Sequence, residues 1–271
     1  MDDLAAFARL IEALRPWLAH VVIVGGWAHR LHRHHPLANP PSFLPLATRD
    51  ADVAFSPNEP MQGDIAVALA AAGFKEERTG EHMPPVSRYR LGDGAGGFYA
   101  EFLAPLSGSA VKRHGKLDAT ALKAGVTAQK LRHVGLLLEK PFAVTVGSAV
   151  GFAIEPAAEV LLPNPVSYIV QKLLIQQERS PGKRPHDVLY VHDTLMLFAS
   201  HLDDLREIWR EDVRPSLPPR TAMRVERLVR ERFREVDDVI RTAARIQPDR
   251  ALRPERVLAA CAAGLGEIFG N

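Results

Sequence analysis

Residues 20–26 read His-Val-Val-Ile-Val-Gly-Gly, a β-branched run that ends in a pair of glycines. β-Branched residues favour a strand, and glycines directly after it favour a tight turn. A helical pattern resumes at Trp27, so the stretch predicts a buried strand, a turn at Gly25-Gly26 and a helix. Glycines at such a turn let the backbone approach a phosphate closely, and the N-terminus of the next helix offers free N–H groups. A plain tight turn without a ligand is the alternative interpretation.

A second strand is expected over residues 48–55, where two acids stand two residues apart. Asp50 and Asp52 alternate with apolar residues, so both carboxylates project from one face of the strand. Carboxylates that share a face are suited to bind Mg²⁺ together with triphosphate oxygens. The alternative is a solvent-facing strand edge whose acids are incidental.

A third acid, Glu101, stands alone in the apolar, strand-like run 98–103. A charged group in such a run is rarely buried without a partner or a metal. If this strand lies beside the strand of Asp50 and Asp52, Glu101 completes a cluster of three carboxylates. An outward-facing residue of an antiparallel sheet is the alternative.

The rest of the chain predicts an α+β fold. Helix patterns cover residues 2–17, 27–34 and 63–73, and further strand patterns cover 86–91, 134–138, 142–146 and 149–154. From residue 164 onward only helix patterns are present. We therefore expect a domain over residues 1–160 with a mixed or antiparallel sheet and helices, followed by an all-helical domain over residues 161–271.

The composition is that of a globular protein. Apolar residues make up 46% of the 271 residues, and the net charge of +2 neither favours nor excludes a nucleic-acid partner. The one cysteine, Cys261, cannot form an intrachain disulfide and is expected to be a small buried apolar residue. The acidic N-terminus does not resemble a signal peptide, and no apolar run is long enough for a membrane span. We expect a cytoplasmic protein without a membrane partner.

The order and spacing of the glycine pair and the three acids resemble the nucleotidyltransferase superfamily with the DNA polymerase β-like fold. Within it, the chain is most similar to the bacterial AbiEii/MenT-type toxin nucleotidyltransferases and their uncharacterised relatives. The resemblance is carried by three motifs, Val24-Gly25-Gly26-Trp27-Ala28, Thr48-Arg49-Asp50-Ala51-Asp52-Val53 and Tyr99-Ala100-Glu101-Phe102-Leu103.

The resemblance implies an enzyme that moves a nucleoside monophosphate from a nucleoside triphosphate (NTP) to an acceptor and releases pyrophosphate. It implies that Asp50, Asp52 and Glu101 bind Mg²⁺ or Mn²⁺, with Glu101 on the second ion or acting as a base. Gly25-Gly26 and Arg49 would then contact the nucleotide.

The resemblance continues beyond the first domain. Residues 163–174 are similar to the family helix that presents a lysine to the nucleotide, which would be Lys172. As a compact cation, Lys172 would meet the charge that builds on the phosphate oxygens. Without the resemblance, Lys172 would be interpreted as an exposed helix residue.

The residues after this helix resemble the next family element, an arginine followed by a lysine–aspartate pair. Arg179, Lys183 and Asp187 are the matching positions, and His186 departs from the pattern because a lysine or arginine commonly precedes the aspartate. Lys183 would substitute for it and contact the nucleotide, while Asp187 would orient Lys172 or Lys183. A surface ion pair is the alternative for Asp187.

Residues 220–245 predict one amphipathic helix with an outer stripe of arginines. The stripe consists of Arg220, Arg224, Arg227, Arg234, Arg241 and Arg245. Such a stripe is suited to follow an RNA backbone. Because Glu231, Glu235 and Asp238 also lie toward it, an ion-paired outer face is the favoured interpretation.

Four histidines, His29, His32, His34 and His35, stand close together after the glycine pair. The spacing of His29 and His32 places them on one helix face, but no cysteine or third acid nearby supports a zinc site. We interpret the four as solvated or in contact with the acceptor.

Transfer RNA is the leading acceptor by resemblance, because this group includes toxins that modify the acceptor end of tRNA. A cognate antitoxin is then a candidate partner. The alternatives are transfer to a protein or a small molecule, and a catalytically inactive nucleotide-binding regulatory or antitoxin module. A dehydrogenase is not expected, because Gly25-Gly26 lacks the spaced third glycine of a dinucleotide fingerprint.

Overall fold

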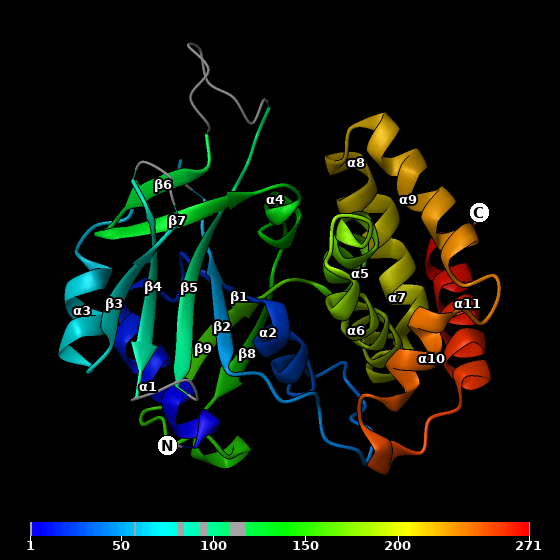
Figure 1. Ribbon diagram of the computed structural model, residues 1–271, viewed down its shortest axis with the longest axis horizontal. Coiled ribbons are helices and arrows are strands. Elements are labelled where there is room, and N and C mark those ends of the chain that lie inside the picture. Colours follow the sequence, from blue (N-terminus) through cyan, green and yellow to red (C-terminus); the bar gives the residue numbers. More distant parts are fainter. Residues whose placement is uncertain (1, 57, 81–83, 93–96, 109–117, 271) are drawn as a thin grey trace. The chain divides into compact units, whose positions relative to one another are not determined.

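The computed structural model describes residues 2–56, 58–80, 84–92, 97–108 and 118–270. These residues divide into two compact units (Figure 1). The sheet unit comprises Met1–His34 and Ala47–Pro163, and the helical unit comprises His35–Leu46 and Asn164–Asn271. The helical unit therefore includes the proline-rich segment that leads from the glycine turn to Asp50. Separate domains over residues 1–160 and 161–271 stay a prediction.

The described strands of the sheet unit form one mixed sheet, in the order β3-β4-β5-β2-β1-β9-β8, with β7 beside β5 and β6 beside β7. The strands are β1 (Val22–Val24), β2 (Asp50–Ala54), β3 (Lys75–Thr79), β4 (Val86–Leu91), β5 (Phe98–Pro105), β6 (Thr120–Lys123), β7 (Val126–Leu131), β8 (Phe142–Val146) and β9 (Ala158–Leu162). The pairs β1–β9, β2–β5 and β5–β7 are parallel, and the other pairs are antiparallel. The predicted α+β class with a mixed sheet is confirmed.

Helices cover one face of this sheet and part of the other. The helices of the unit are α1 (Asp3–Leu14), α2 (Gly25–His32), α3 (Ile65–Ala71) and α4 (Val134–Leu137). Phe7 of α1 stacks on Trp27 of α2 with ring centres 3.9 Å apart, and Trp27 meets Phe98 of β5 edge-on. On the opposite face, Val134 and Leu137 of α4 pack in a second buried cluster. Beyond this cluster the second face carries polar side chains.

The described residues of the helical unit form helices and no strand. The helices are α5 (Pro165–Ile175), α6 (Arg184–Leu197), α7 (Leu202–Glu207), α8 (Arg214–Ser216), α9 (Pro219–Arg232), α10 (Asp238–Arg245) and α11 (Pro254–Phe269). Asn164 caps α5 by accepting a hydrogen bond from the Ser167 N–H at 2.8 Å, and Pro165 occupies the first helical position. Cys261 of α11 is fully buried, as expected, and burial raises the pKa of its thiol. No helix in the described part of the chain is long and apolar enough to cross a membrane.

Three sequence predictions of secondary structure are wrong. Residues 134–138 form α4 and not a strand, because Val134 and Leu137 bury one helical side against the sheet. Residues 149–154 form no strand, since Gly151 adopts φ +86° in a turn. The strand that follows β8 along the chain is β9 instead. Residues 220–245 form two helices, because Asp237 caps a new one by accepting from the Ile240 N–H at 2.8 Å.

Candidate active site

The carboxylates of Asp50, Asp52 and Glu101 lie on one face of the sheet. β2 and β5 are parallel neighbours, and Asp52 stands directly beside Glu101 in their register, with Asp50 two residues earlier on the same face. Between the acids, Ala51 and Ala100 point the other way and are fully buried. Asp50 is exposed, and Asp52 and Glu101 are partly exposed. The condition under which Glu101 would join the two aspartates, that their strands are neighbours, is therefore met.

The glycine pair leaves room for one of these acids and for the segment before it. Gly25 has φ +64°, a conformation that side chains rarely adopt, and a Cβ there would lie 2.1 Å from Oδ2 of Asp52. A Cβ on Gly26 would lie 2.9 Å from side-chain atoms of Thr48. Helix α2 begins at Gly25, earlier than the expected start at Trp27, so its N-terminus lies against the Asp52 carboxylate. Close contact with Asp52 and Thr48 thus requires both glycines, and contact with a phosphate stays a prediction.

Glu101 is bound to a cation on the neighbouring strand. Arg88 of β4 stands opposite Glu101 in register, and the two side chains form an ion pair. The Arg88 guanidinium also lies over the ring of Tyr99, 5.1 Å from its centre. Throughout the described ranges, no group of three or more His, Cys, Asp and Glu side chains is arranged to hold a metal ion.

The donor chemistry of this face nevertheless fits a divalent cation such as Mg²⁺. Asp50 and Asp52 offer hard carboxylate oxygens from one side of one strand, which are the ligands that Mg²⁺ prefers. The missing side chain of Gly25 makes room for the Asp52 carboxylate itself. Glu101 stands beside Asp52 on the same face of the sheet. To become a ligand, its carboxylate would leave Arg88 and bind the cation.

The helical unit buries a second group of charged residues. The side chains of Lys172 in α5 and Asp187 in α6 are 4% and 3% exposed, and Nζ of Lys172 lies 3.5 Å from Oδ1 of Asp187. Nε of Arg179 donates to Oδ2 of Asp187 at 3.1 Å. Nζ of Lys172 also lies 5.1 Å and 5.3 Å from the ring centres of Tyr168 and Tyr190. The interpretations of Lys172 as an exposed residue and of Asp187 as a surface ion pair are wrong, because the packing of α5 against α6 encloses both.

A family model described as nucleotidyltransferase matches residues 2–214. The match includes Asp50, Asp52 and Glu101 of the sheet unit and Lys172, Arg179 and Asp187 of the helical unit. The chain belongs to this nucleotidyltransferase family. It is therefore an enzyme of nucleotidyl transfer with an NTP substrate, and the alternative of a catalytically inactive binding module is not supported. No curated protein matches the chain significantly.

The other nucleotide contacts expected of this nucleotidyltransferase lie at the surface of the two units. Arg49 is exposed beside Asp50, and its carbonyl accepts from the Tyr99 N–H at 3.1 Å. Lys183, on the turn before α6, and His186, in its first turn, are exposed. The nucleotide contacts of Arg49 and Lys183 stay predictions.

The histidine group of the nucleotidyltransferase is mostly inside the protein. His29 and His32 are 2% and 0% exposed, and Nε2 of His32 lies 2.8 Å from the carbonyl oxygen of Pro163. The interpretation of these two as solvated or in contact with the acceptor is wrong, because the inner side of α2 carries them. His34 and His35 are partly buried, and burial lowers the pKa of each.

Sequence reasoning missed Arg88, although a signal for it was present. The alternation along β4 buries Ser87, Tyr89 and Leu91, which leaves Arg88 on the opposite face of the strand. That face is the one that carries Glu101 on the next strand.

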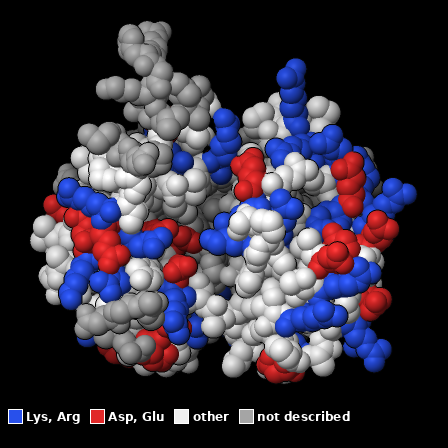
Figure 2. All heavy atoms as spheres, viewed as in Figure 1, with Lys and Arg blue, Asp and Glu red and all other residues white. Residues whose placement is uncertain are grey.

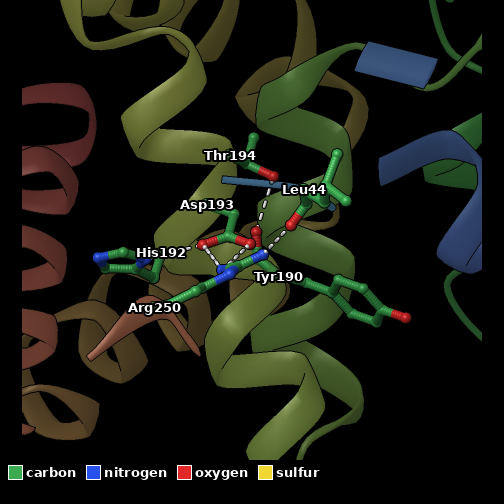
Figure 3. Close-up of polar contacts among 6 residues, drawn as sticks. All are labelled: Leu44, Tyr190, His192, Asp193, Thr194 and Arg250. Atoms are coloured by element: carbon green, nitrogen blue, oxygen red, sulfur yellow. Dashed lines mark hydrogen bonds and ion pairs between the residues drawn. The ribbon is translucent and has the colours of Figure 1, made fainter. Parts of the chain in front are cut away.

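Sequence reasoning also missed a buried ion pair in the helical unit, which Figure 3 shows. Nη1 of Arg250 lies 2.9 Å and 2.8 Å from the two carboxylate oxygens of Asp193, and Nη2 donates to the carbonyl of Leu44 at 2.7 Å. Nδ1 of His192 lies 2.9 Å from Oδ1 of Asp193, and the Arg250 guanidinium covers the ring of Phe43 at 3.9 Å. The pair joins residues 57 positions apart and so leaves no local signal. It fastens the proline-rich segment 35–46 to the helices.

Proposed function

We propose that this nucleotidyltransferase uses a divalent metal on the face of Asp50, Asp52 and Glu101 to transfer a nucleoside monophosphate to tRNA. The supporting observation is the register that puts Asp52 beside Glu101, with Gly25 leaving room at the Asp52 carboxylate. Like charges on neighbouring strands repel each other and destabilise a sheet. A cation bound by both acids would offset that repulsion, which accounts for carboxylates at neighbouring positions.

Mg²⁺ or Mn²⁺ would be held by Asp50 and Asp52, with Glu101 as a further ligand. When bound, the metal neutralises triphosphate charge and activates the acceptor hydroxyl. In the transfer, the hydroxyl oxygen bonds to the α-phosphorus while the bond from that phosphorus to the β-phosphate oxygen breaks. Pyrophosphate leaves, and the hydroxyl proton passes to a carboxylate or to water.

Lys172 and Asp187 are proposed to act together on the phosphate charge. Asp187 and the rings of Tyr168 and Tyr190 fix the position of the Lys172 ammonium group. A cation held in this way needs little reorganisation when negative charge develops on phosphate oxygens. Gly25-Gly26, Arg49 and Lys183 complete the proposed nucleotide contacts.

The tRNA acceptor, the toxin role and a cognate antitoxin in the cytoplasm rest on the AbiEii/MenT-type motifs. The arginine stripe gives limited further support. The exposed arginines Arg220, Arg227, Arg234, Arg241 and Arg245 lie on α9, α10 and the link between them. However, Arg227 pairs with Glu231 at 3.8 Å and Arg241 with Asp238 at 3.0 Å. Figure 2 likewise shows basic and acidic side chains interleaved over the helical unit.

The acceptor is tested by incubating the full chain with Mg²⁺, each α-³²P-labelled NTP in turn and either total bacterial tRNA, bacterial protein or a small-molecule extract. We expect label on a tRNA-sized band of a denaturing gel, and its loss when EDTA removes the metal. Label on a protein band or a small molecule would contradict the tRNA acceptor and leave the chemistry standing. Label in the presence of EDTA would contradict the metal.

A matched pair of variants ties the labelling to the proposed site. Asp52→Asn removes a proposed ligand, whereas Glu77→Gln removes an acid on β3 of the same sheet that is bonded to Nε of Arg90 at 2.6 Å. Labelling should vanish in the first variant and persist in the second.

A further inference from the structure

Glu101 lies between a cation and an acid in one row across the sheet. In the registers of β4, β5 and β2, Arg88 stands on one side of Glu101 and Asp52 on the other. Neighbouring strands are ~4.8 Å apart, so both Arg88 and a cation held at Asp52 are within reach of the Glu101 carboxylate. In the structure, this carboxylate is paired with Arg88.

The surroundings of Arg88 direct it to Glu101. Its guanidinium lies over the Tyr99 ring, and its Nε is buried without a hydrogen-bond partner in the described part of the chain. The acid opposite Arg88 on β3 is Glu77, but the Glu77 carboxylate accepts from Nε of Arg90 at 2.6 Å. Glu101 is therefore the carboxylate that neutralises Arg88.

The pair between Arg88 and Glu101 is suited to exchange. The two side chains are 41% and 24% exposed, and ion pairs that accessible contribute little to stability. A divalent cation between Asp52 and Glu101 would offer the same carboxylate twice the charge.

We propose that Arg88 is a positioning residue that holds Glu101 out of the metal site until a divalent cation binds. The inference rests on the proposed function, because it presumes a metal at Asp50 and Asp52. Arg88 then competes with the metal for one carboxylate and lowers the affinity of the metal-free protein for it. Removing Arg88 should accordingly tighten metal binding, in contrast to removing a ligand.

The test is equilibrium binding of Mn²⁺ to the full chain without nucleotide, measured from the spin-resonance signal of free Mn²⁺. We expect Arg88→Gln to lower the Mn²⁺ Kd about fivefold, because a competitor and a nearby positive charge are lost. Arg88→Lys keeps the charge but loses the planar group that stacks on Tyr99, so its effect should have the same sign and be smaller.

Two controls separate competition from general electrostatics. Arg90→Gln removes an equal charge from the same strand, but its carboxylate partner is Glu77, so the Kd should change less than about twofold. In a Glu101→Gln background, Arg88→Gln should also change the Kd less than about twofold, since the shared carboxylate is gone.

Four results would overturn the inference. Weaker Mn²⁺ binding in Arg88→Gln would mean that Arg88 orders Glu101 for the metal, and equal tightening in Arg88→Gln and Arg90→Gln would mean a general charge effect. The unmodified chain could bind Mn²⁺ and Asp52→Asn lose this binding, while Arg88→Gln leaves the Kd unchanged. In that case the metal site stands and the role proposed for Arg88 is wrong. If the unmodified chain binds no Mn²⁺, the proposed metal site fails as well.

Discussion

The pair of Arg88 and Glu101 in the sheet unit and the pair of Arg250 and Asp193 in the helical unit differ most in burial. In the sheet unit, the side chains of Arg88 and Glu101 are 41% and 24% exposed, whereas those of Arg250 and Asp193 in the helical unit are 1% and 2% exposed. An exposed pair contributes little and can change partners, but removing one member of a buried pair leaves an uncompensated charge. The pair in the sheet unit thus has charges that a ligand can take over, and the pair in the helical unit fastens segments of its own unit.

The pair of Lys172 and Asp187 shares features with both of these ion pairs. It is buried like the pair of Arg250 and Asp193, yet Asp187 also has Arg179 as a second cation at 3.1 Å. Loss of Lys172 therefore leaves the buried carboxylate partly compensated. Substitution of Lys172 should therefore affect activity more than it affects the free energy of unfolding.

The largest effect is expected at the sheet face. Asp52→Asn should lower kcat/KM for nucleotidyl transfer about a thousandfold, equivalent to about 4 kcal/mol of transition-state stabilisation. The free energy of unfolding should stay the same or rise, because the repulsion between neighbouring carboxylates is relieved. Steady-state kinetics and thermal unfolding of the same preparation measure both quantities. A lower free energy of unfolding in Asp52→Asn would contradict the view that this face binds a ligand and does not stabilise the fold.

The next largest effect is expected in the helical unit. Arg250→Met should lower the free energy of unfolding by about 3–5 kcal/mol, because Asp193 is left buried without its cation. The double variant Arg250→Met/Asp193→Leu should recover most of this loss, since no charge is left buried. Urea denaturation of the single and double variants measures the difference, and a single variant within about 1 kcal/mol of the unmodified chain would show that the pair is not structural.

A smaller loss of stability is expected at the pair of Lys172 and Asp187. Lys172→Met should lower the free energy of unfolding by about 1–2 kcal/mol, because Arg179 still compensates Asp187. Activity should fall about a hundredfold, since the cation for the phosphate charge is lost. Unchanged kcat in a destabilised variant would limit Lys172 to a structural role.

A loss of stability similar to that of Lys172→Met is expected at the glycine turn. Gly25→Ala places a Cβ at φ +64° and 2.1 Å from Oδ2 of Asp52, so about 1–2 kcal/mol of stability should be lost as the carboxylate is displaced. Metal affinity should fall with it. Gly182→Ala is the matched control, because a Cβ there meets no atom within 4 Å, and its effect should stay within about 0.5 kcal/mol. Equal effects of the two substitutions, measured by urea denaturation and Mn²⁺ binding, would argue against a role for Gly25 beside Asp52.

Local patterns predicted much of the sheet unit. The strand, glycine turn and helix at residues 20–34 and the alternation around Asp50 and Asp52 are confirmed, because each depends on neighbours in sequence. Residues 134–138 were misassigned because a short apolar run suits a helix and a strand equally. β3 was missed because its Lys-Glu-Glu-Arg-Thr residues carry no apolar alternation, and only pairing with β4 makes it a strand.

The candidate site was predicted only where sequence order and strand faces suffice. The partnership of Arg88 with Glu101 depends on the register between two strands, which the sequence does not state. The burial of Lys172 and Asp187 depends on how α5 packs against α6. Helical spacing alone could not distinguish this from a solvent-facing lysine.

The rate of pyrophosphate release from an NTP, with Mg²⁺ and total tRNA present, tests most directly whether the face of Asp50, Asp52 and Glu101 performs the transfer. It should be compared between the unmodified chain, Asp52→Asn and Glu77→Gln. We expect release about a thousandfold slower from Asp52→Asn and a rate within about twofold of the unmodified chain from Glu77→Gln, whose acid pairs with Arg90. Equal rates for Asp52→Asn and Glu77→Gln would contradict the assignment of the active site to this face.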